Sequence, residues 1–118
     1  MVENLRKRIQ EMVGYLPKAV RLSGRVDEEL GGSLEEGVGE LYMNAWREGA
    51  LSRKDKHLLV LAMALGDDNH SQVRRLLEKC RKEGASEREL MEVLELALWV
   101  KGVPTFVSAA QMMLGDGD

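Results

Sequence analysis

The stretch HLLVLAMALGDDNHSQVRRLLEKC, residues 57–80, decides the fold class of this chain. An almost uninterrupted apolar run, His57 to Leu65, ends at a glycine and a polar cluster, Asp67 to His70. Apolar residues then recur at helical spacing, at Val73, Leu76, Leu77 and Cys80. A strand would alternate polar and apolar residues along its length instead. The pattern therefore predicts two consecutive helices with a polar corner between them.

The same pattern predicts seven helices along the chain, near residues 2–13, 17–30, 33–48, 53–65, 68–83, 87–101 and 104–114. Two of the predicted helices begin with a capping box, Ser33 with Glu36 and Ser86 with Glu89, in which each residue satisfies a free backbone N–H of the other. Glycines are predicted to end six of them in a left-handed conformation. They are Gly14, Gly31 with Gly32, Gly49, Gly66, Gly84 and Gly102.

The connections between the predicted helices are short, so we expect neighbouring helices to pack antiparallel in an all-α, compact multi-helix bundle. Gly37 and Gly39 weaken the helix that contains them, by about 1 kcal/mol each relative to alanine, which favours close helix packing there. With 118 residues, we expect a single domain over residues 1–118 whose tail, 115–118, is frayed.

Composition excludes several classes of protein. The net charge of −3 argues against a nucleic-acid partner, because binding to phosphates needs a basic surface. No stretch is long and apolar enough to span a membrane, and the charged start MVENLRKRIQEM is unlike a signal peptide, so we expect a cytoplasmic protein. The single cysteine, Cys80, excludes chemistry that needs two thiols in one chain.

Two predicted helices are apolar nearly all round, HLLVLAMAL at residues 57–65 and LMEVLELALWV at residues 90–100. Such central helices are buried on more than one side. A chain of this size has little interior to hide both, so we expect part of their surface to contact another copy. The methionine-rich end SAAQMML suits that contact or the filling of the core.

Three segments together, LSRKDKHLLVLAMALG, EGASERELMEVLELAL and KGVPTFVSAAQMM, resemble the carboxymuconolactone decarboxylase and AhpD-like alkylhydroperoxidase superfamily. The resemblance covers roughly residues 16–113. It implies an AhpD-like all-α domain that assembles into a homotrimer or homohexamer, with sites near the contacts between subunits.

The peroxidase branch of that family carries Cys-x-x-Cys followed four residues later by histidine, with a glutamate upstream. Matched without gaps, these four positions fall on Asn69, Gln72, Leu76 and His57, so none of the four residues is retained. Cys80 lies in an apolar stripe and is expected to be a small core residue, which disfavours antioxidant chemistry.

The decarboxylase branch commonly lacks the cysteine pair and carries histidine in this region. The resemblance therefore implies a cofactor-free reaction, without a metal, on a small carboxylated lactone. Opening such a ring needs a proton carrier, and His70 is the nearest match, with His57 assisting. The structural alternative is that Asp67, Asp68 and Asn69 cap the helix that follows, with His70 in its first turn, and that His57 is a core residue.

Other polar residues are weaker candidates. Glu92 and Glu95 share a helix face with Trp99 and are expected to need a partner, most simply in a salt bridge. A metal site of His57, Asp67, Asp68 and His70 has suitable ligand types but no characteristic spacing. A substrate carboxylate could bind Arg47, Arg74 or Arg75, and the sequence does not choose among them.

Three functions follow: a lactone enzyme with His70 and His57, a non-catalytic oligomeric binding module, or a residual antioxidant using Cys80. An enzyme should place a histidine in a pocket with converging polar groups. A module should show structural or solvated histidines and an exposed apolar surface. The antioxidant needs an exposed thiol.

Overall fold

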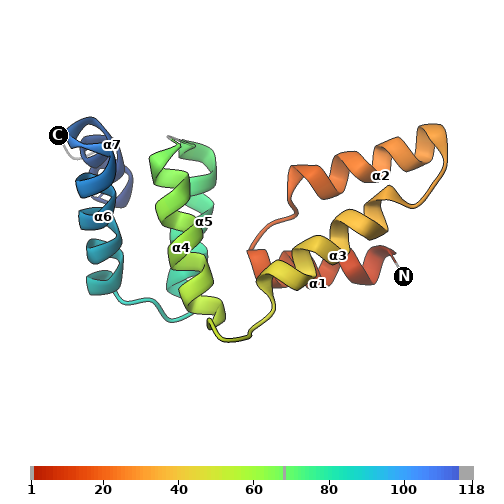
Figure 1. Cartoon of the computed structure of the whole chain (residues 1–118), viewed down its shortest axis with the longest axis horizontal. Helices are drawn as coiled ribbons and strands as arrows, with labels where there is room; N and C mark the ends of the chain where they lie inside the picture. The colour runs from red at the N-terminus through yellow and green to blue at the C-terminus, as the bar shows by residue number, and fades with distance from the viewer. Residues whose placement is uncertain (1, 68, 115–118) are drawn as a thin grey trace. The chain divides into compact units, whose positions relative to one another are not determined.

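The computed structural model describes residues 2–67 and 69–114, and these form seven α-helices with no strand among them (Figure 1). The helices are α1 (Val2–Val13), α2 (Lys18–Leu30), α3 (Leu34–Trp46), α4 (Arg53–Gly66), α5 (His70–Lys82), α6 (Glu87–Lys101) and α7 (Val103–Leu114). The all-α prediction is confirmed, and each described boundary lies within two residues of its predicted place. Residues 115–118, for which fraying was predicted, and Asp68 lie outside the described residues.

The chain divides into two compact units, Met1–Arg53 and Lys54–Asp118. In the first unit α3 packs against both α1 and α2. Gly39 makes the packing of α3 on α1 possible, because a Cβ atom there would lie 2.5 Å from the Leu5 Cδ2 atom. Close packing at Gly39 is therefore confirmed. At Gly37 the prediction is wrong, since a Cβ atom would meet nothing within 4 Å.

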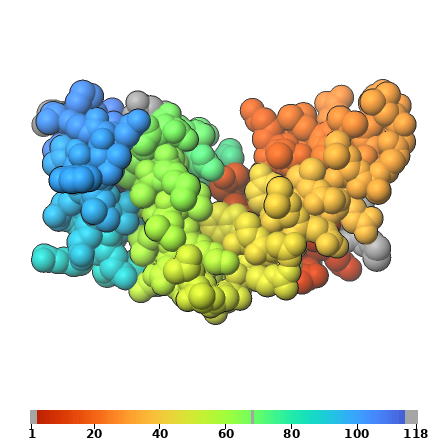
Figure 2. Space-filling view, viewed as in Figure 1, coloured from red at the N-terminus to blue at the C-terminus, as the bar shows by residue number. Residues whose placement is uncertain are grey.

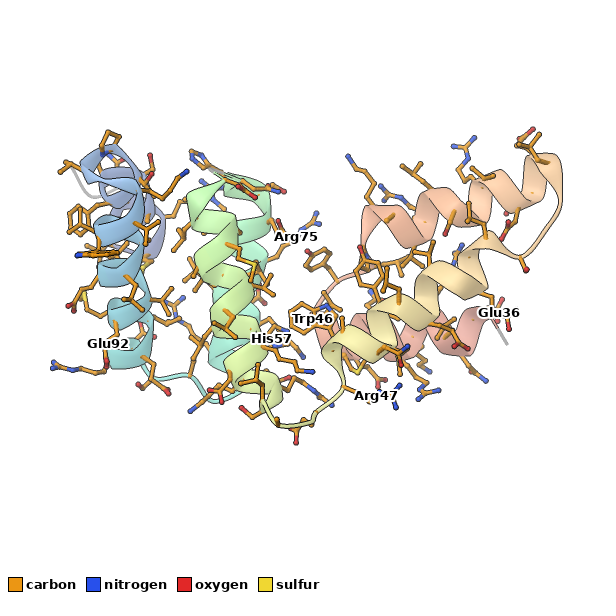
Figure 3. All side chains as sticks on the ribbon, in the orientation of Figure 1. Glu36, Trp46, Arg47, His57, Arg75 and Glu92 are labelled. Carbon is orange, nitrogen blue, oxygen red and sulfur yellow. The ribbon has the colours of Figure 1, made fainter. Side chains whose placement is uncertain are left out.

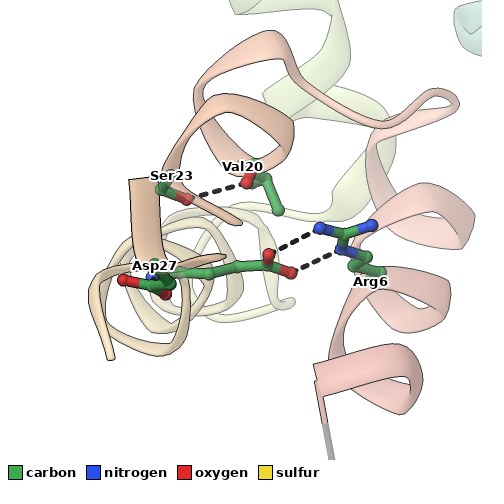
Figure 4. A network of polar contacts seen from close by, with 5 residues as sticks. Arg6, Val20, Ser23 and Asp27 are labelled. Atoms are coloured by element: carbon green, nitrogen blue, oxygen red, sulfur yellow. Dashed lines mark hydrogen bonds and ion pairs between the residues drawn. The ribbon is translucent and has the colours of Figure 1, made fainter. Parts of the chain in front are cut away.

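A partly buried ion pair joins α1 to α3 in the same unit (Figure 4). The Arg6 guanidinium donates two hydrogen bonds to the Glu35 carboxylate, with Nε to Oε2 at 2.5 Å and Nη2 to Oε1 at 2.6 Å. The Glu35 side chain is only 3 % exposed, and the bond to it raises the pKa of Arg6. Gly24 of α2 leaves room for this pair, because a Cβ atom there would collide with both groups.

The start of α3 is capped from α2, and the predicted capping box of Ser33 with Glu36 is wrong. Ser33 makes no side-chain cap hydrogen bond. The Asp27 carboxylate instead accepts the Leu34 N–H at 2.8 Å and the Glu35 N–H at 2.9 Å. A carboxylate at this helix end also interacts favourably with the helix dipole. Local sequence spacing could not reveal a cap supplied by a neighbouring helix.

Four helices, α4 to α7, surround one core in the second unit. The core includes Leu61, Val73, Leu76 and Leu90, and Met112 and Met113 pack against it half-buried. Core filling is therefore the role of these two methionines within the chain. Lys54 at the start of α4 is joined to Glu89 of α6, with Nζ 2.8 Å from Oε2. That ammonium group and the Ser86 N–H lower the pKa of Glu89.

The second predicted capping box, Ser86 with Glu89, is confirmed at the start of α6. The Ser86 hydroxyl accepts the Glu89 N–H at 3.0 Å, and the Glu89 carboxylate accepts the Ser86 N–H at 2.8 Å. Among the predicted glycine stops, positive φ values occur at Gly14, Gly31, Gly32, Gly84 and Gly102. Gly49 and Gly66 do not take that conformation.

The two predicted capping boxes give a matched test. Ser86→Ala removes a hydrogen bond to a helix N-terminus and is expected to lower the free energy of unfolding by about 1 kcal/mol. Ser33→Ala removes no cap and is expected to change it by less than about 0.3 kcal/mol. Urea unfolding followed by circular dichroism measures both. If both variants lose the same free energy of unfolding, the conclusion that Ser86 caps its helix and Ser33 does not is wrong.

Candidate functional site

His57 lies in the early part of α4, one turn before Val60 and Leu61 (Figure 3). Its ring is completely buried. A dissolved substrate cannot touch a side chain with no exposed surface in this conformation. The position agrees with the core-residue interpretation of His57.

His70 is the first residue of α5 and is exposed. The preceding residue, Asn69, caps the helix: its Oδ1 atom accepts the Gln72 N–H at 3.2 Å, and its Nδ2 atom donates to Gln72 Oε1 at 3.0 Å. The capping role predicted for Asn69 is confirmed. Asp67 is exposed beside it, and the role predicted for Asp68 falls outside the described residues.

The structure does not bring the two histidines together. His57 lies near the beginning of α4, whereas His70 follows its end. Nine residues of helix from His57 to Gly66 correspond to about 13 Å along the axis. Among the residues that the structure describes, no three metal-ligating side chains are grouped as a metal site requires. A shared acid/base pair of His57 and His70 stays a prediction.

Cys80 is fully buried in the core of the second unit, as predicted. Burial raises the pKa of its thiol to about 11, well above the ordinary value of 9.0. The thiolate is the reactive form of cysteine, so this side chain lacks both the access and the ionisation that thiol chemistry needs. The geometry removes the support for the antioxidant interpretation.

A thiol reagent tests this environment directly. In the folded protein at pH 8, Cys80 is expected to react with Ellman's reagent at least about a hundredfold more slowly than in 6 M urea, because most of the thiol stays protonated and covered. The absorbance of the released thiolate measures both rates. Immediate stoichiometric labelling of the folded protein would show that the thiol is accessible.

The acidic residues of α6 do not form the salt bridge predicted for them. Glu92 and Glu95 are exposed, and within the described part of the chain neither takes part in an ion pair. Both carboxylates are solvated, so they need no protein partner. Three apolar residues of the same helix are also largely exposed: Trp99 at 85 %, Val100 at 68 % and Leu96 at 63 %.

An unexpected cavity lies in the first unit, between α1 and α3. It has a volume of about 250 Å³ and is lined by Leu5, Arg8, Glu40, Met43, Asn44 and Arg47. Of the three arginines that the sequence left open, Arg47 therefore borders a cavity, whereas Arg74 and Arg75 are exposed on α5. The other lining residues were not predicted as site residues. The signal that could have indicated those on α3 is their helical spacing. Residues 40, 43, 44 and 47 share one face of a helix.

Among the helices that the structure describes, none has the length and apolar character needed to cross a membrane. A family model described as the carboxymuconolactone decarboxylase family matches residues 33–114. The match begins directly before α3 and ends with α7, so α1 and α2 precede it. No curated protein and no solved structure matches the chain.

Proposed function

Because this chain belongs to the carboxymuconolactone decarboxylase family, we propose that it works as a homo-oligomeric binding module of that family. The contact between copies is formed by a surface of α6 and α7 that consists of Leu96, Trp99, Val100, Val103 and Val107, here named the α6–α7 apolar surface. The observation that carries the proposal is the exposure of Trp99, at 85 %.

The α6–α7 apolar surface has five exposed apolar side chains on two neighbouring helices, whereas single exposed apolar residues are ordinary on protein surfaces. Leu96, Trp99 and Val100 share one face of α6, and Val103 and Val107 are one turn apart on α7, which packs on α6. These two helices form the blue part of the chain in Figure 2. On the two helices these five side chains are 46–85 % exposed. Large exposed apolar patches mark interaction sites in soluble proteins. A stable contact takes about 800 Å² from each partner, and five large side chains centred on a tryptophan supply much of that area.

A second copy of the chain is the partner that this surface fits best. Helix α7, VPTFVSAAQMML, contains no charged residue, so the α7 part of the surface brings no like charges together when two copies pair. Glu92 and Glu95 lie on the face of α6 that carries Trp99, at the border of the contact. Symmetric homo-oligomers use such self-complementary patches. The exposed position of His70 and the buried position of His57 agree with a module, in which neither ring handles protons.

Light scattering after size-exclusion chromatography tests the proposal. The intact chain is expected to elute with the mass of a homotrimer or homohexamer. Trp99→Glu places a charge in the apolar contact and is expected to lower the mass to that of the monomer. Leu30→Glu is the matched control, because Leu30 is 82 % exposed on α2 and outside the surface. A monomeric intact chain, or equal effects of the two variants, would overturn the proposal.

A second candidate function is the decarboxylation or isomerisation of a carboxylated lactone, with His70 as the histidine that a dissolved substrate can reach. An exposed side chain can contact a dissolved substrate and act as the proton carrier of such a reaction. If this candidate is right, the intact protein is expected to release carbon dioxide from carboxymuconolactone or to isomerise it. His70→Ala should lower that rate by about a hundredfold while Ser71→Ala, next to it on α5, leaves the rate unchanged. The absence of both products with the intact protein would exclude this candidate for that lactone.

A further inference from the structure

We propose that the groove between α2 and α3 binds a basic amphipathic helix of a partner protein. The groove lies in the first unit and has a volume of about 580 Å³. This partner goes beyond the proposed self-association, because the groove shares no residue with the α6–α7 apolar surface. One wall of the groove is α2, which lies outside the residues that the family model matches.

Apolar side chains from both helices line the groove. They are Val26 and Leu30, one turn apart on α2, and Leu34, Val38 and Leu41, on one face of α3. The two helices pack on each other and are joined by the turn at residues 31–33 (Figure 1). Four of the side chains are 40–82 % exposed, and Val38 is half-buried. A row of exposed apolar residues along a groove marks an interaction site.

Gly37 leaves part of this groove open. A Cβ atom at this position would meet nothing within 4 Å, so no contact within the described chain requires a glycine here. Gly37 lines the groove and lies inside α3, where glycine is less favourable than any residue except proline. A backbone without a side chain lets a second helix approach closely. A partner in the groove accounts for this glycine, whereas packing within the chain does not.

An acidic hollow adjoins the groove at the turn between α2 and α3. It has a volume of about 510 Å³ and shares Asp27, Gly32 and Ser33 with the groove. Its lining contains five carboxylates and a single cation, Arg6, which is paired with Glu35. The five acidic residues are Glu3, Asp27, Glu28, Glu35 and Glu36. The groove therefore ends beside a concentration of negative charge.

The charge of the hollow determines the sign of the partner. Glu3, Glu28 and Glu36 are exposed, and within the described residues none of them takes part in an ion pair. Residues 26–46 contain six acidic residues and no Lys or Arg. Lysine or arginine side chains beside the groove thus find carboxylates that no ion pair neutralises. An acidic partner or an anionic membrane surface is repelled.

The walls of the groove determine the form of the partner. Both walls are α-helices, whose backbone groups bond within each helix, so the groove offers no strand edge to an extended peptide. A partner that binds here has to satisfy its own backbone N–H and C=O groups, as a helix does. Its apolar face fills the groove, and basic residues at one end reach the hollow beside residues 31–33.

Binding of two synthetic peptides to the full chain tests the proposal. The probe, LKKLLKLLKKLLKL, forms an amphipathic helix with lysines beside a leucine face, and the control, LEELLELLEELLEL, has the same leucine face with glutamates. Fluorescence anisotropy of the labelled peptides is expected to show at least about tenfold tighter binding of the lysine peptide, and a smaller difference at high salt. If the two peptides bind equally, or if the lysine peptide does not bind, the proposal is wrong.

A variant that fills the groove locates the peptide. Gly37→Leu places a side chain in the open part of the groove and is expected to weaken binding of the lysine peptide at least about tenfold, with the helix content by circular dichroism retained. Gly49→Leu is the matched control, because Gly49 also has no neighbour within 4 Å but lies outside the groove. Equal binding by the two variants would place the peptide elsewhere and overturn the proposal.

Charge variants test the acidic hollow. Glu28→Gln combined with Glu36→Gln is expected to weaken binding of the lysine peptide about fivefold and not to weaken that of the glutamate peptide. Glu48→Gln combined with Glu78→Gln removes the same charge outside both the groove and the hollow, and should change binding of either peptide by less than about twofold. Equal weakening by the two double variants would mean that only the net charge attracts the peptide, which contradicts the proposed site.

The peptide site and the proposed self-association can fail separately. Trp99→Glu is expected to change the mass of the assembly and to keep peptide binding, because Trp99 belongs to the second unit. Gly37→Leu is expected to keep the mass of the assembly and to lose peptide affinity. Loss of peptide binding in Trp99→Glu would place the peptide on the α6–α7 apolar surface, and a lower mass of Gly37→Leu would show that a second copy occupies the groove. Either result overturns the proposal.

Discussion

Arg6→Ala is expected to lower the free energy of unfolding by about 3 kcal/mol, because it leaves the Glu35 carboxylate buried without its partner. Glu35 is only 3 % exposed, and both of its oxygen atoms accept hydrogen bonds from Arg6. This value is at the lower end of the loss expected when one partner of a buried ion pair is removed. The Arg6 side chain is 36 % exposed, so water can replace some of its interaction with Glu35 in the variant. Urea unfolding followed by the fluorescence of Trp46 in a Trp99→Phe background measures the loss in the first unit.

Two controls separate the ion pair from other effects at α1. Lys7→Ala removes an exposed cation from the neighbouring position and is expected to change the free energy of unfolding by less than about 0.5 kcal/mol. The double variant Arg6→Met with Glu35→Met removes both charges and is expected to be more stable than Arg6→Ala. If Arg6→Ala lowers the free energy of unfolding by no more than Lys7→Ala does, the Arg6–Glu35 pair does not hold α1 to α3.

Leu90→Ala is expected to lower the free energy of unfolding by about 3 kcal/mol, because it opens a cavity in the core of the second unit. Leu90 has no exposed surface and lies on the face of α6 that also carries Val93, Leu94 and Ala97. Its neighbours come from several helices and can close the space only partly. Urea unfolding followed by circular dichroism at low protein concentration measures the loss.

Leu96→Ala is the matched control on the same helix. Leu96 is 63 % exposed on the α6–α7 apolar surface, so its truncation is expected to change the unfolding of the separate chain by less than about 0.5 kcal/mol. It should instead weaken the association between copies. A loss in Leu96→Ala as large as in Leu90→Ala would mean that Leu96 is buried within the chain.

The sequence was most reliable where a structural signal is contained within a few residues. The capping box of Ser86 and Glu89, the cap at Asn69 and the burial of Cys80 all follow from helical spacing and were confirmed. Helix spacing also revealed the apolar character of α6, because its Leu, Val and Trp residues cover more than one face. These features depend on contacts within one helix or within one turn of its end.

The sequence was less reliable wherever a neighbouring helix supplied the partner. Ser33 has the residue type and spacing of a cap, but the Asp27 carboxylate of α2 caps this helix instead, through the Leu34 and Glu35 N–H groups. The Arg6–Glu35 pair joins residues 29 positions apart, and no short motif marks it. The solvation of Glu92 and Glu95 was missed for a related reason, since an apolar helix can still present an exposed face.

The sequence by itself determined that the chain is all-α, where its seven described helices begin and end to within two residues, and that Cys80 lies in the core, because these depend on the local periodicity of apolar residues. Only the tertiary structure decided that Gly24 and Gly39 admit close neighbours, that Asp27 caps α3, and that residues of α1 and α3 line one cavity. Helical spacing places a side chain on a face of its own helix. Which other helix meets that face depends on how the whole set of apolar surfaces is buried together.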